Sequence, residues 1–280
     1  MSMNPKYLMD TFNIDPKKSL GQNFLHDPNA LEKIVHTAGI TSQDTVLEIG
    51  PGTGALTVYL AQTAAQVIAV EIDDRLMPIL EQQLRDFSNV QVIHADILNV
   101  DIDDLVYGRE FIVVANLPYY ITSAILRHLL EGSHKPKRLI LTVQQEVAER
   151  LVAPPGDLSL LAISVLYYGQ PRIVTRLAPA AFWPRPDVAS AVVRIDVYDH
   201  TPVDVPNDDL FFRVVRAGFG QKRKQLRNSI GAGLGISHPQ AGAILETAGV
   251  DPMRRAETLT LEEWAAITRV VDIQYAHRLA

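Results

Sequence analysis

The tetrapeptide Asn116-Leu117-Pro118-Tyr119 brings together groups that could act on a nitrogen base. The Asn116 side-chain oxygen and the Leu117 carbonyl are hydrogen-bond acceptors, and the Tyr119 ring offers a flat surface for stacking. An exocyclic amine on a planar base needs such partners, because it carries two N–H donors beside a flat ring. A plain strand followed by a proline turn also fits these residues, so the neighbouring elements must decide between the two interpretations.

A glycine-rich turn follows another apolar run. Gly50, Gly52 and Gly54 are spaced differently from the GxGxxG dinucleotide pattern, and glycines let the backbone approach a ligand closely. Glu48, two residues before the first glycine, could orient a cationic amine. A glycine triplet alone is weak support for a cofactor loop.

Two further carboxylates lie at the ends of the next strands along the chain. Glu71 could accept hydrogen bonds from a ribose diol, and Asp96 could accept one from an adenine amine. Each carboxylate alone is explained as well by a solvated strand end or a helix cap. Because three successive strand ends carry such groups, a ligand site is the better interpretation.

Apolar runs bounded by turn residues predict the elements that position these groups. We expect strands at residues 45–49, 66–72, 90–94, 111–115, 138–143, 173–177 and 189–195. A helix opening at Asp27-Pro28 precedes the first strand, and helical periodicity recurs between the strands that follow. This alternation predicts a mostly parallel α/β sheet covered on both faces. The carboxyl ends of parallel strands form the ligand-binding edge of such a sheet.

The flanking segments differ in character from the predicted sheet. We expect residues 1–26 to form an ordered arm without helix or strand, residues 27–198 the α/β domain, and residues 199–209 a polar, proline-rich linker. Residues 210–280 read as helices, the last of them opening with a capping box formed by Thr260 and Glu263.

Composition limits the class of protein. The 280 residues include no cysteine, which excludes disulfides and cysteine-ligated metals, and the eight histidines show no metal-ligand spacing. No apolar signal core or membrane-length run occurs, so we expect a cytoplasmic protein, a monomer without metal.

The net charge of −6 hides a basic segment. Residues 210–245 contain no carboxylate, and nucleic-acid binding depends on local charge and not on the total. A solvated helix face is the usual explanation of such a run, but its length favours an RNA contact. The cations that we expect to contact RNA are Lys17, Lys18, Lys222, Arg223, Lys224 and Arg227.

Phe182 lies in the proline-rich segment 178–187. A base that reacts in a deep site must leave its stack, and Tyr119 and Phe182 are candidates to stack on its two faces. A buried core aromatic is the competing interpretation of Phe182.

Several motifs together resemble one enzyme family. Residues 46–57 look like motif I of class I S-adenosylmethionine-dependent methyltransferases, and residues 116–119 resemble their adenine-N6 catalytic motif. With residues 17–25, 143–151, 182–188 and 221–229 included, the chain resembles the KsgA/RsmA family of ribosomal RNA adenine dimethyltransferases along almost its whole length. Ser19, Leu20, Ala178, Asp187 and Ala189 depart from the family pattern.

The resemblance implies a Rossmann-like, seven-stranded sheet with a small helical C-terminal domain that binds RNA. It implies N6,N6-dimethylation of two adjacent adenines in the 3′-terminal hairpin loop of 16S rRNA, within a precursor of the small ribosomal subunit. Asn116, Leu117, Pro118, Tyr119 and Phe182 would serve catalysis. The donor S-adenosylmethionine would be bound by Gln22, Asn23, Leu25, Glu48, Gly50, Gly52, Gly54, Glu71, Asp96 and Asn116.

Three alternatives remain open from the sequence. An Erm-type methyltransferase acting on large-subunit rRNA shares the fold and the Asn-x-Pro-Tyr motif, although residues 221–229 fit it less well. A non-catalytic RNA-binding assembly or transcription factor could use the same fold. The third alternative is a NAD-dependent oxidoreductase. Against it, the sequence contains neither the GxGxxG pattern nor a group positioned for hydride transfer.

Overall fold

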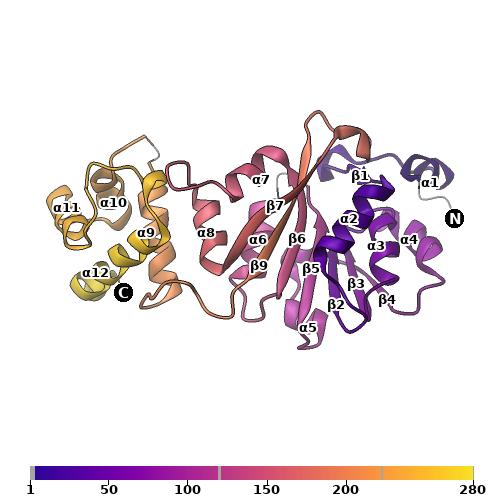
Figure 1. Cartoon of the computed structure of the whole chain (residues 1–280), viewed down its shortest axis with the longest axis horizontal. Coiled ribbons are helices and arrows are strands. Elements are labelled where there is room, and N and C mark those ends of the chain that lie inside the picture. The colour runs from indigo at the N-terminus through magenta and orange to yellow at the C-terminus, as the bar shows by residue number, and fades with distance from the viewer. Residues whose placement is uncertain (1–3, 119–120, 222, 280) are drawn as a thin grey trace. The chain divides into compact units, whose positions relative to one another are not determined.

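The computed structural model describes residues 4–118, 121–221 and 223–279, the side chains of 275–279 excepted. The chain forms two compact units (Figure 1). The first runs to Glu149 and resumes over Gln170–Val197, and the second comprises Arg150–Gly169 and the chain from Tyr198 onward. Residues 150–169 therefore belong to the C-terminal unit, whereas the sequence pattern assigns them to the α/β domain.

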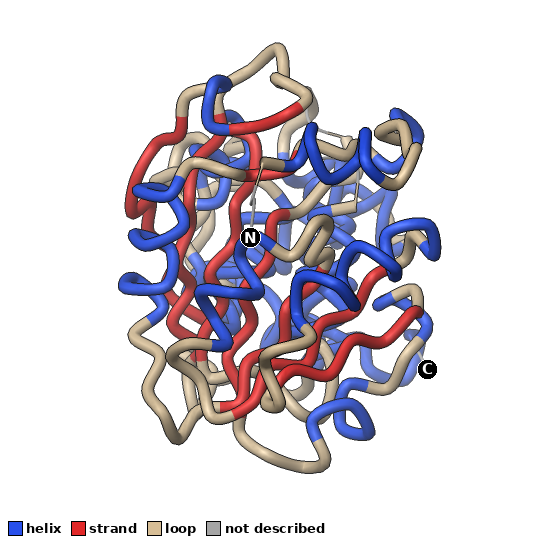
Figure 2. Tube along the Cα trace, turned by 90° about the vertical axis from the view of Figure 1, so that its right-hand side faces the viewer, coloured by secondary structure: helices blue, strands red, loops and turns tan. Residues whose placement is uncertain are grey.

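A seven-stranded sheet forms the centre of the first unit, its strands side by side (Figure 2). The five strands that come first in the sheet order pair in parallel, and β9 is antiparallel to β6. The fold is thus α/β with a mostly parallel sheet, as predicted. The order is β4 (Val90–His94), β3 (Gln66–Glu71), β2 (Thr45–Ile49), β5 (Phe111–Asn116), β6 (Arg138–Gln144), β9 (Ser190–Val197) and β7 (Gly169–Leu177).

The register brings the predicted site groups to one edge of this sheet. Ile49 pairs with Ala115, and Glu71 pairs with His94, so β2, β3, β4 and β5 end at nearly the same level. Asn116 is the last residue of β5. Because parallel strands share their carboxyl-terminal edge, the acidic and amide groups converge there.

Helices cover the sheet, whose central strands are buried on both faces. All five residues of β2 are buried. In α2, the Asp27 carboxylate accepts from the N–H groups of Asn29 and Ala30, and Gly39 ends the helix with a positive φ of 59°, which confirms the predicted cap. The helices of this part of the chain are α2 (Pro28–Ala38), α3 (Ala55–Ala61), α4 (Met77–Leu84), α5 (Ile102–Val106), α6 (Thr122–Leu130) and α7 (Gln145–Leu151), with short 3₁₀ turns η2 (Asp74–Leu76) and η3 (Ile97–Asn99).

The N-terminal arm contains regular structure, so the expectation of an arm without helix or strand is wrong. Its first helix is short; Asn4 caps it, and Pro5, Leu8 and Met9 are buried. Too few turns are present for a helical period to be visible in the sequence. The elements are α1 (Pro5–Thr11), η1 (Lys18–Leu20) and β1 (Phe24–Leu25), which pairs antiparallel with β8 (Phe182–Trp183) after the turn η4 (Pro179–Ala181).

The second unit is helical, as expected for residues 210–280. Trp264 is fully buried, and a Cβ at Gly218 would lie 2.2 Å from its ring, so only glycine fits opposite it. Thr260 and Glu263 form the predicted capping box, with bonds of 2.8 and 3.2 Å. The elements are α8 (Leu160–Tyr168), α9 (Asp208–Phe219), α10 (Leu226–Leu234), α11 (His238–Thr247), η5 (Ala256–Thr258) and α12 (Leu261–Leu279).

Candidate active site

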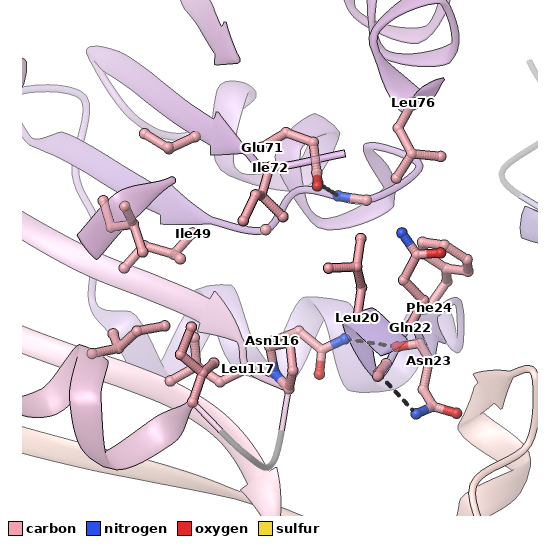
Figure 3. Close-up of a pocket in the computed structure, with 18 of the residues that line it drawn as sticks. Leu20, Gln22, Asn23, Phe24, Ile49, Glu71, Ile72, Leu76, Asn116 and Leu117 are labelled. Atoms are coloured by element: carbon pink, nitrogen blue, oxygen red, sulfur yellow. Dashed lines mark hydrogen bonds between the residues drawn. The ribbon is translucent and has the colours of Figure 1, made fainter. Parts of the chain in front are cut away.

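A pocket opens at the carboxyl-terminal edge of the sheet and is closed on one side by the N-terminal arm (Figure 3). The ends of β2, β3 and β5, the turn after β4, and the arm all contribute to its wall. Most of the residues predicted for the site line it. These are Gln22, Asn23, Gly50, Gly52, Glu71, Asp96, Asn116, Leu117, Pro118 and Phe182.

Three predicted site residues are placed differently, and a fourth is not described. Leu25 and Glu48 line a smaller cavity beside the pocket, which also touches Asn116. Gly54 lines neither cavity; it precedes α3 with φ 82°, a conformation that favours glycine, and faces Leu80. The prediction for Tyr119 lies outside the described residues.

The orientation of the Asn116 amide follows from one hydrogen bond. Its Nδ2 donates to the Asn23 carbonyl oxygen over 2.9 Å (Figure 3). A carbonyl can only accept, so the amide group that faces it must be the NH₂. The Asn116 Oδ1 is consequently turned away from the Asn23 carbonyl, and no residue of the described chain donates to it. Because Asn116 lines the pocket, this oxygen is a candidate acceptor for a ligand.

Glu71 is a buried carboxylate held by backbone donors. Its Oε2 accepts from the Gly52 N–H at 3.0 Å and its Oε1 from the Asp73 N–H at 2.9 Å, and the residue is 4% exposed. Burial is the main cause that raises the pKa of Glu71, and the two backbone N–H groups oppose that rise. Each carboxylate oxygen keeps a second lone pair for hydroxyl groups of a ligand.

Asp96 both caps a turn and lines the pocket. Its Oδ1 accepts from the Leu98 N–H at 3.0 Å and its Oδ2 from the Asn99 side chain at 3.2 Å. The capping role and the ligand role therefore coexist, because both carboxylate oxygens have further acceptor capacity.

Phe182 contacts both the pocket and the core. It is 4% exposed and packs in a hydrophobic cluster with Leu25 and Leu177. The core interpretation of this ring therefore holds for most of its surface, while the ring also forms part of the pocket wall.

Several apolar residues of the pocket were missed by the sequence analysis, among them Ile72 and Ile97. Ile72 is 47% exposed although it is large and apolar, and Ile97 lies with it in the pocket wall. An exposed apolar side chain in a pocket is typical of a surface that a planar ligand covers. Each directly follows a predicted strand-end carboxylate, Glu71 or Asp96, and that spacing is the signal that could have identified them.

Glu48 has an unusual protonation. It is 1% exposed, and its Oε2 has no hydrogen-bond partner among the described residues. Burial, with a smaller contribution from the nearby Glu71 charge, raises the pKa of Glu48 to about 8.

This pKa predicts a pH-dependent stability. The pKa in the folded state exceeds the ordinary value of 4.5, so the folded protein keeps a proton that the unfolded chain releases, and the resulting stabilisation is lost as pH rises toward 8. We expect Glu48→Gln to become increasingly more stable than the wild type between about pH 5 and pH 8. Urea unfolding across this range measures the difference. The exposed Glu32→Gln provides the control, and a difference that does not change with pH would contradict the assignment.

The predicted RNA-binding cations are exposed. Lys17 and Lys18 lie in the arm, and Arg223, Lys224 and Arg227 lie in the second unit. Within the described chain none of the five is in an ion pair, so their charge is available to a partner. Lys222 lies outside the described residues.

Two kinds of feature are absent from the described ranges. No cluster of three or more histidine or acidic side chains there could hold a metal ion. Across residues 4–118, 121–221 and 223–279, the helices lack the length and apolar character required to cross a bilayer.

Solved structures with the same fold establish the class of protein. A dimethyladenosine transferase from Plasmodium falciparum superposes with a TM-score of 0.77 and 26% identity, covering 89% of this chain and 98% of that one. The 23S rRNA methyltransferase ErmE gives a TM-score of 0.70 and 28% identity, covering 89% and 100%. The parallel sheet, its glycine turn and its acidic strand ends thus define a class I S-adenosylmethionine-dependent methyltransferase.

Sequence comparisons identify the family. The model of the family described as "Ribosomal RNA adenine dimethylase" matches residues 13–272. Ribosomal RNA small subunit methyltransferase A of Dehalococcoides mccartyi (strain CBDB1) is 45% identical over 261 residues, covering 92% of this chain and 89% of that protein. The protein of the same name from Moorella thermoacetica is 45% identical over 268 residues, covering 92% and 93%. The chain therefore belongs to the ribosomal RNA adenine dimethylase family.

Proposed function

We propose that this protein transfers methyl groups from S-adenosylmethionine to the N6 amines of two adjacent adenines in the 3′-terminal hairpin loop of 16S rRNA. The observation that carries the proposal is the Asn116 amide in the pocket wall, whose nitrogen is held by the Asn23 carbonyl so that its oxygen is turned away from that carbonyl. The relatives named as small subunit methyltransferases support the choice of substrate.

The pocket residues fit the methyl donor. When bound, S-adenosylmethionine supplies a methyl group on a positively charged sulfonium. Glu71 would accept from the ribose hydroxyls and Asp96 from the adenine amine, with Ile72 and Ile97 against the faces of that base. Glu48, in the adjoining cavity, has an oxygen without a partner among the described residues that would accept from the amine end of the donor.

Asn116 and Leu117 would activate the acceptor amine. An adenine amine is a poor nucleophile, because its lone pair is delocalised into the ring. The Asn116 Oδ1 and the Leu117 carbonyl would accept its two hydrogens and favour a pyramidal nitrogen with a localised lone pair. A neutral amide does this without forming a salt bridge to a neighbouring cation. After one transfer, the same acceptors would serve the remaining hydrogen.

The base would be held by stacking. We assign one face to Tyr119 and the other to Phe182, each contributing roughly 1–3 kcal/mol. Pro118 would stiffen the chain between Asn116 and Tyr119. The support for Phe182 is its place in the pocket wall.

The exposed cations would contact RNA phosphates, and affinity would then fall with salt. Arg223, Lys224 and Arg227 belong to the helical unit, and Lys17 and Lys18 to the arm. We assign the second unit to RNA binding on this charge, and the substrate to a precursor of the small subunit that the protein meets in the cytoplasm as a monomer.

A second candidate is methylation of large-subunit rRNA. The structural similarity to ErmE, a 23S rRNA methyltransferase, supports it. The relatives at 45% identity favour the small subunit over this candidate.

Labelled methyl transfer to isolated ribosomal subunits tests the proposal. We expect label in unmethylated small subunits, at two adjacent adenines of the 16S rRNA, and none above background in large subunits. Small subunits that already carry the modification provide the control. Label in 23S rRNA would favour the second candidate, and label in neither subunit would leave the protein without the proposed activity.

A further inference from the structure

Gln22 joins the arm to the sheet through both ends of its side-chain amide. Its Oε1 accepts from the Lys17 N–H at 2.7 Å, and its Nε2 donates to the Asp73 Oδ2 at 2.7 Å. We call this connection the Gln22 bridge. Although Gln22 lines the pocket, its amide already has partners within the chain, so its position does not require a ligand contact.

Asp73 is the anchor of the bridge on the sheet side. It is 3% exposed, and it accepts two bonds from the Arg75 guanidinium, at 2.8 and 2.6 Å. The Arg75 bonds are the main cause that lowers the pKa of Asp73, so it is a carboxylate that can only accept. Arg75 also donates to the Asp15 carbonyl at 3.3 Å, which fixes the arm at a second point.

The bridge ends one residue before the group that orients Asn116. The Asn23 carbonyl accepts from the Asn116 Nδ2, and Asn23 directly follows Gln22. The terminal torsion of an asparagine is broad and nearly two-fold, so the side chain itself hardly selects which end of the amide faces the pocket. The selection depends on where the arm holds the Asn23 carbonyl.

The arm beyond Asn23 is fixed independently. Phe24 and Leu25 pair with Trp183 and Phe182, and a Cβ at Gly52 would lie 2.8 Å from the Phe24 ring. The segment between Asp15 and Asn23 contains no such pairing, and the hydrogen bonds of Gln22 and Arg75 attach it to the turn after β3.

We propose that Gln22 and Asp73 are positioning residues for methyl transfer: the Gln22 bridge sets the Asn23 carbonyl, which keeps the Asn116 oxygen turned toward the acceptor amine. The inference rests on the proposed function. Asp73 also connects Asn116, assigned to the acceptor amine, with Glu71, assigned to the methyl donor, because the Asp73 N–H donates to the Glu71 carboxylate.

A complementary exchange tests the bridge. Gln22→Glu sets two carboxylates against each other. Asp73→Asn, with its NH₂ in the place of Oδ2, opposes both the Gln22 NH₂ and the Arg75 Nη2 group, since both donate to Oδ2. In the double variant the new amide at position 73 donates to the new carboxylate at position 22, whose other oxygen still accepts from Lys17. We expect each single variant to lower kcat about 10–100-fold, as small displacements of reacting groups do. The double variant should recover part of this loss and be faster than either single variant, because the bond between positions 22 and 73 returns while the Arg75 bond to Oδ2 stays broken.

Two further measurements separate positioning from other roles. The dissociation constant of S-adenosylmethionine should change about threefold or less in the single variants, since the bridge acts on Asn116 and both ends of the Gln22 amide are bonded within the chain. The Lys17 amide proton should exchange faster in each single variant and regain protection in the double variant. Asp10→Asn, an exposed change on the same arm, is the matched control and should leave all three quantities unchanged.

The outcomes distinguish this inference from the proposed function. Loss of donor affinity in step with kcat, or a double variant as slow as the single variants, would overturn the positioning role while wild-type transfer stands. Absence of transfer by the wild type would instead remove the proposed function. In either case, the bridge is supported if the Lys17 amide proton loses protection from exchange in the single variants and regains it in the double variant. Unchanged protection in the single variants contradicts the bridge.

Discussion

Asn116→Ala should lower kcat for methyl transfer to unmethylated small subunits by about 10²–10³-fold, the usual effect of removing one preorganised polar group from an active site. The variant loses the Oδ1 acceptor, whose orientation is set by the bond between the Asn116 nitrogen and the Asn23 carbonyl. Binding of S-adenosylmethionine should weaken much less than turnover, because Glu71 and Asp96 remain. Single-turnover transfer of labelled methyl groups and calorimetric titration of the donor measure the two effects.

Asn116→Asp serves as the matched comparison for this change. It keeps the shape but replaces the NH₂ with an oxygen that cannot donate to the Asn23 carbonyl. We expect it to be as slow as Asn116→Ala, although it retains an acceptor, because the oriented amide is what the site requires. Full activity in Asn116→Asp would contradict the orientation argument, and full activity in Asn116→Ala would remove the catalytic role of the side chain.

The second large effect is expected for Glu71→Gln, a change that looks conservative. Both carboxylate oxygens accept from backbone N–H groups, so an amide in either orientation sets its NH₂ against the Gly52 or Asp73 N–H. A buried hydrogen bond to a charged group contributes about 1.5–3 kcal/mol. We therefore expect donor affinity to fall about tenfold or more. The free energy of unfolding should drop by about 1.5–3 kcal/mol. Calorimetry and urea unfolding measure the two quantities.

Glu81→Gln, an exposed change on α4, is the control for this experiment. Unchanged affinity in Glu71→Gln would show that this carboxylate does not contact the donor. Weaker affinity with unchanged stability would indicate that the backbone donors find other partners.

Most helices and strands of the fold are predictable from the sequence, because the residues that begin and end them act over short stretches of chain. Asp27, Pro28 and Gly39 mark the limits of α2 through cap chemistry that acts within a few residues, and the Thr260 box opens α12 in the same way. The strand ends are predictable for a related reason: buried parallel strands are continuous apolar runs, and Glu71 and Asn116 come at the points where such runs stop.

Long-range contacts account for what the sequence does not predict. The partner of Gln22 is Asp73, and the partner of Asn116 is Asn23, and neither pairing leaves a periodic pattern. The arm helix α1 is too short to show a period, and its stability comes from the buried Leu8 and Met9. The glycines of the turn illustrate the same limit, since spacing cannot tell that Gly52 faces the pocket while Gly54 faces Leu80.

The chain has two tryptophans, and each compact unit contains one of them. Trp183 stacks on Phe24 of the arm, with ring centroids 6.4 Å apart, and Trp264 is enclosed in the helical unit. Replacing either indole with phenylalanine leaves a single intrinsic fluorophore. Emission spectra of the two resulting proteins would then follow the melting of each unit separately, with no label attached, and the Trp183 signal would also register detachment of the arm.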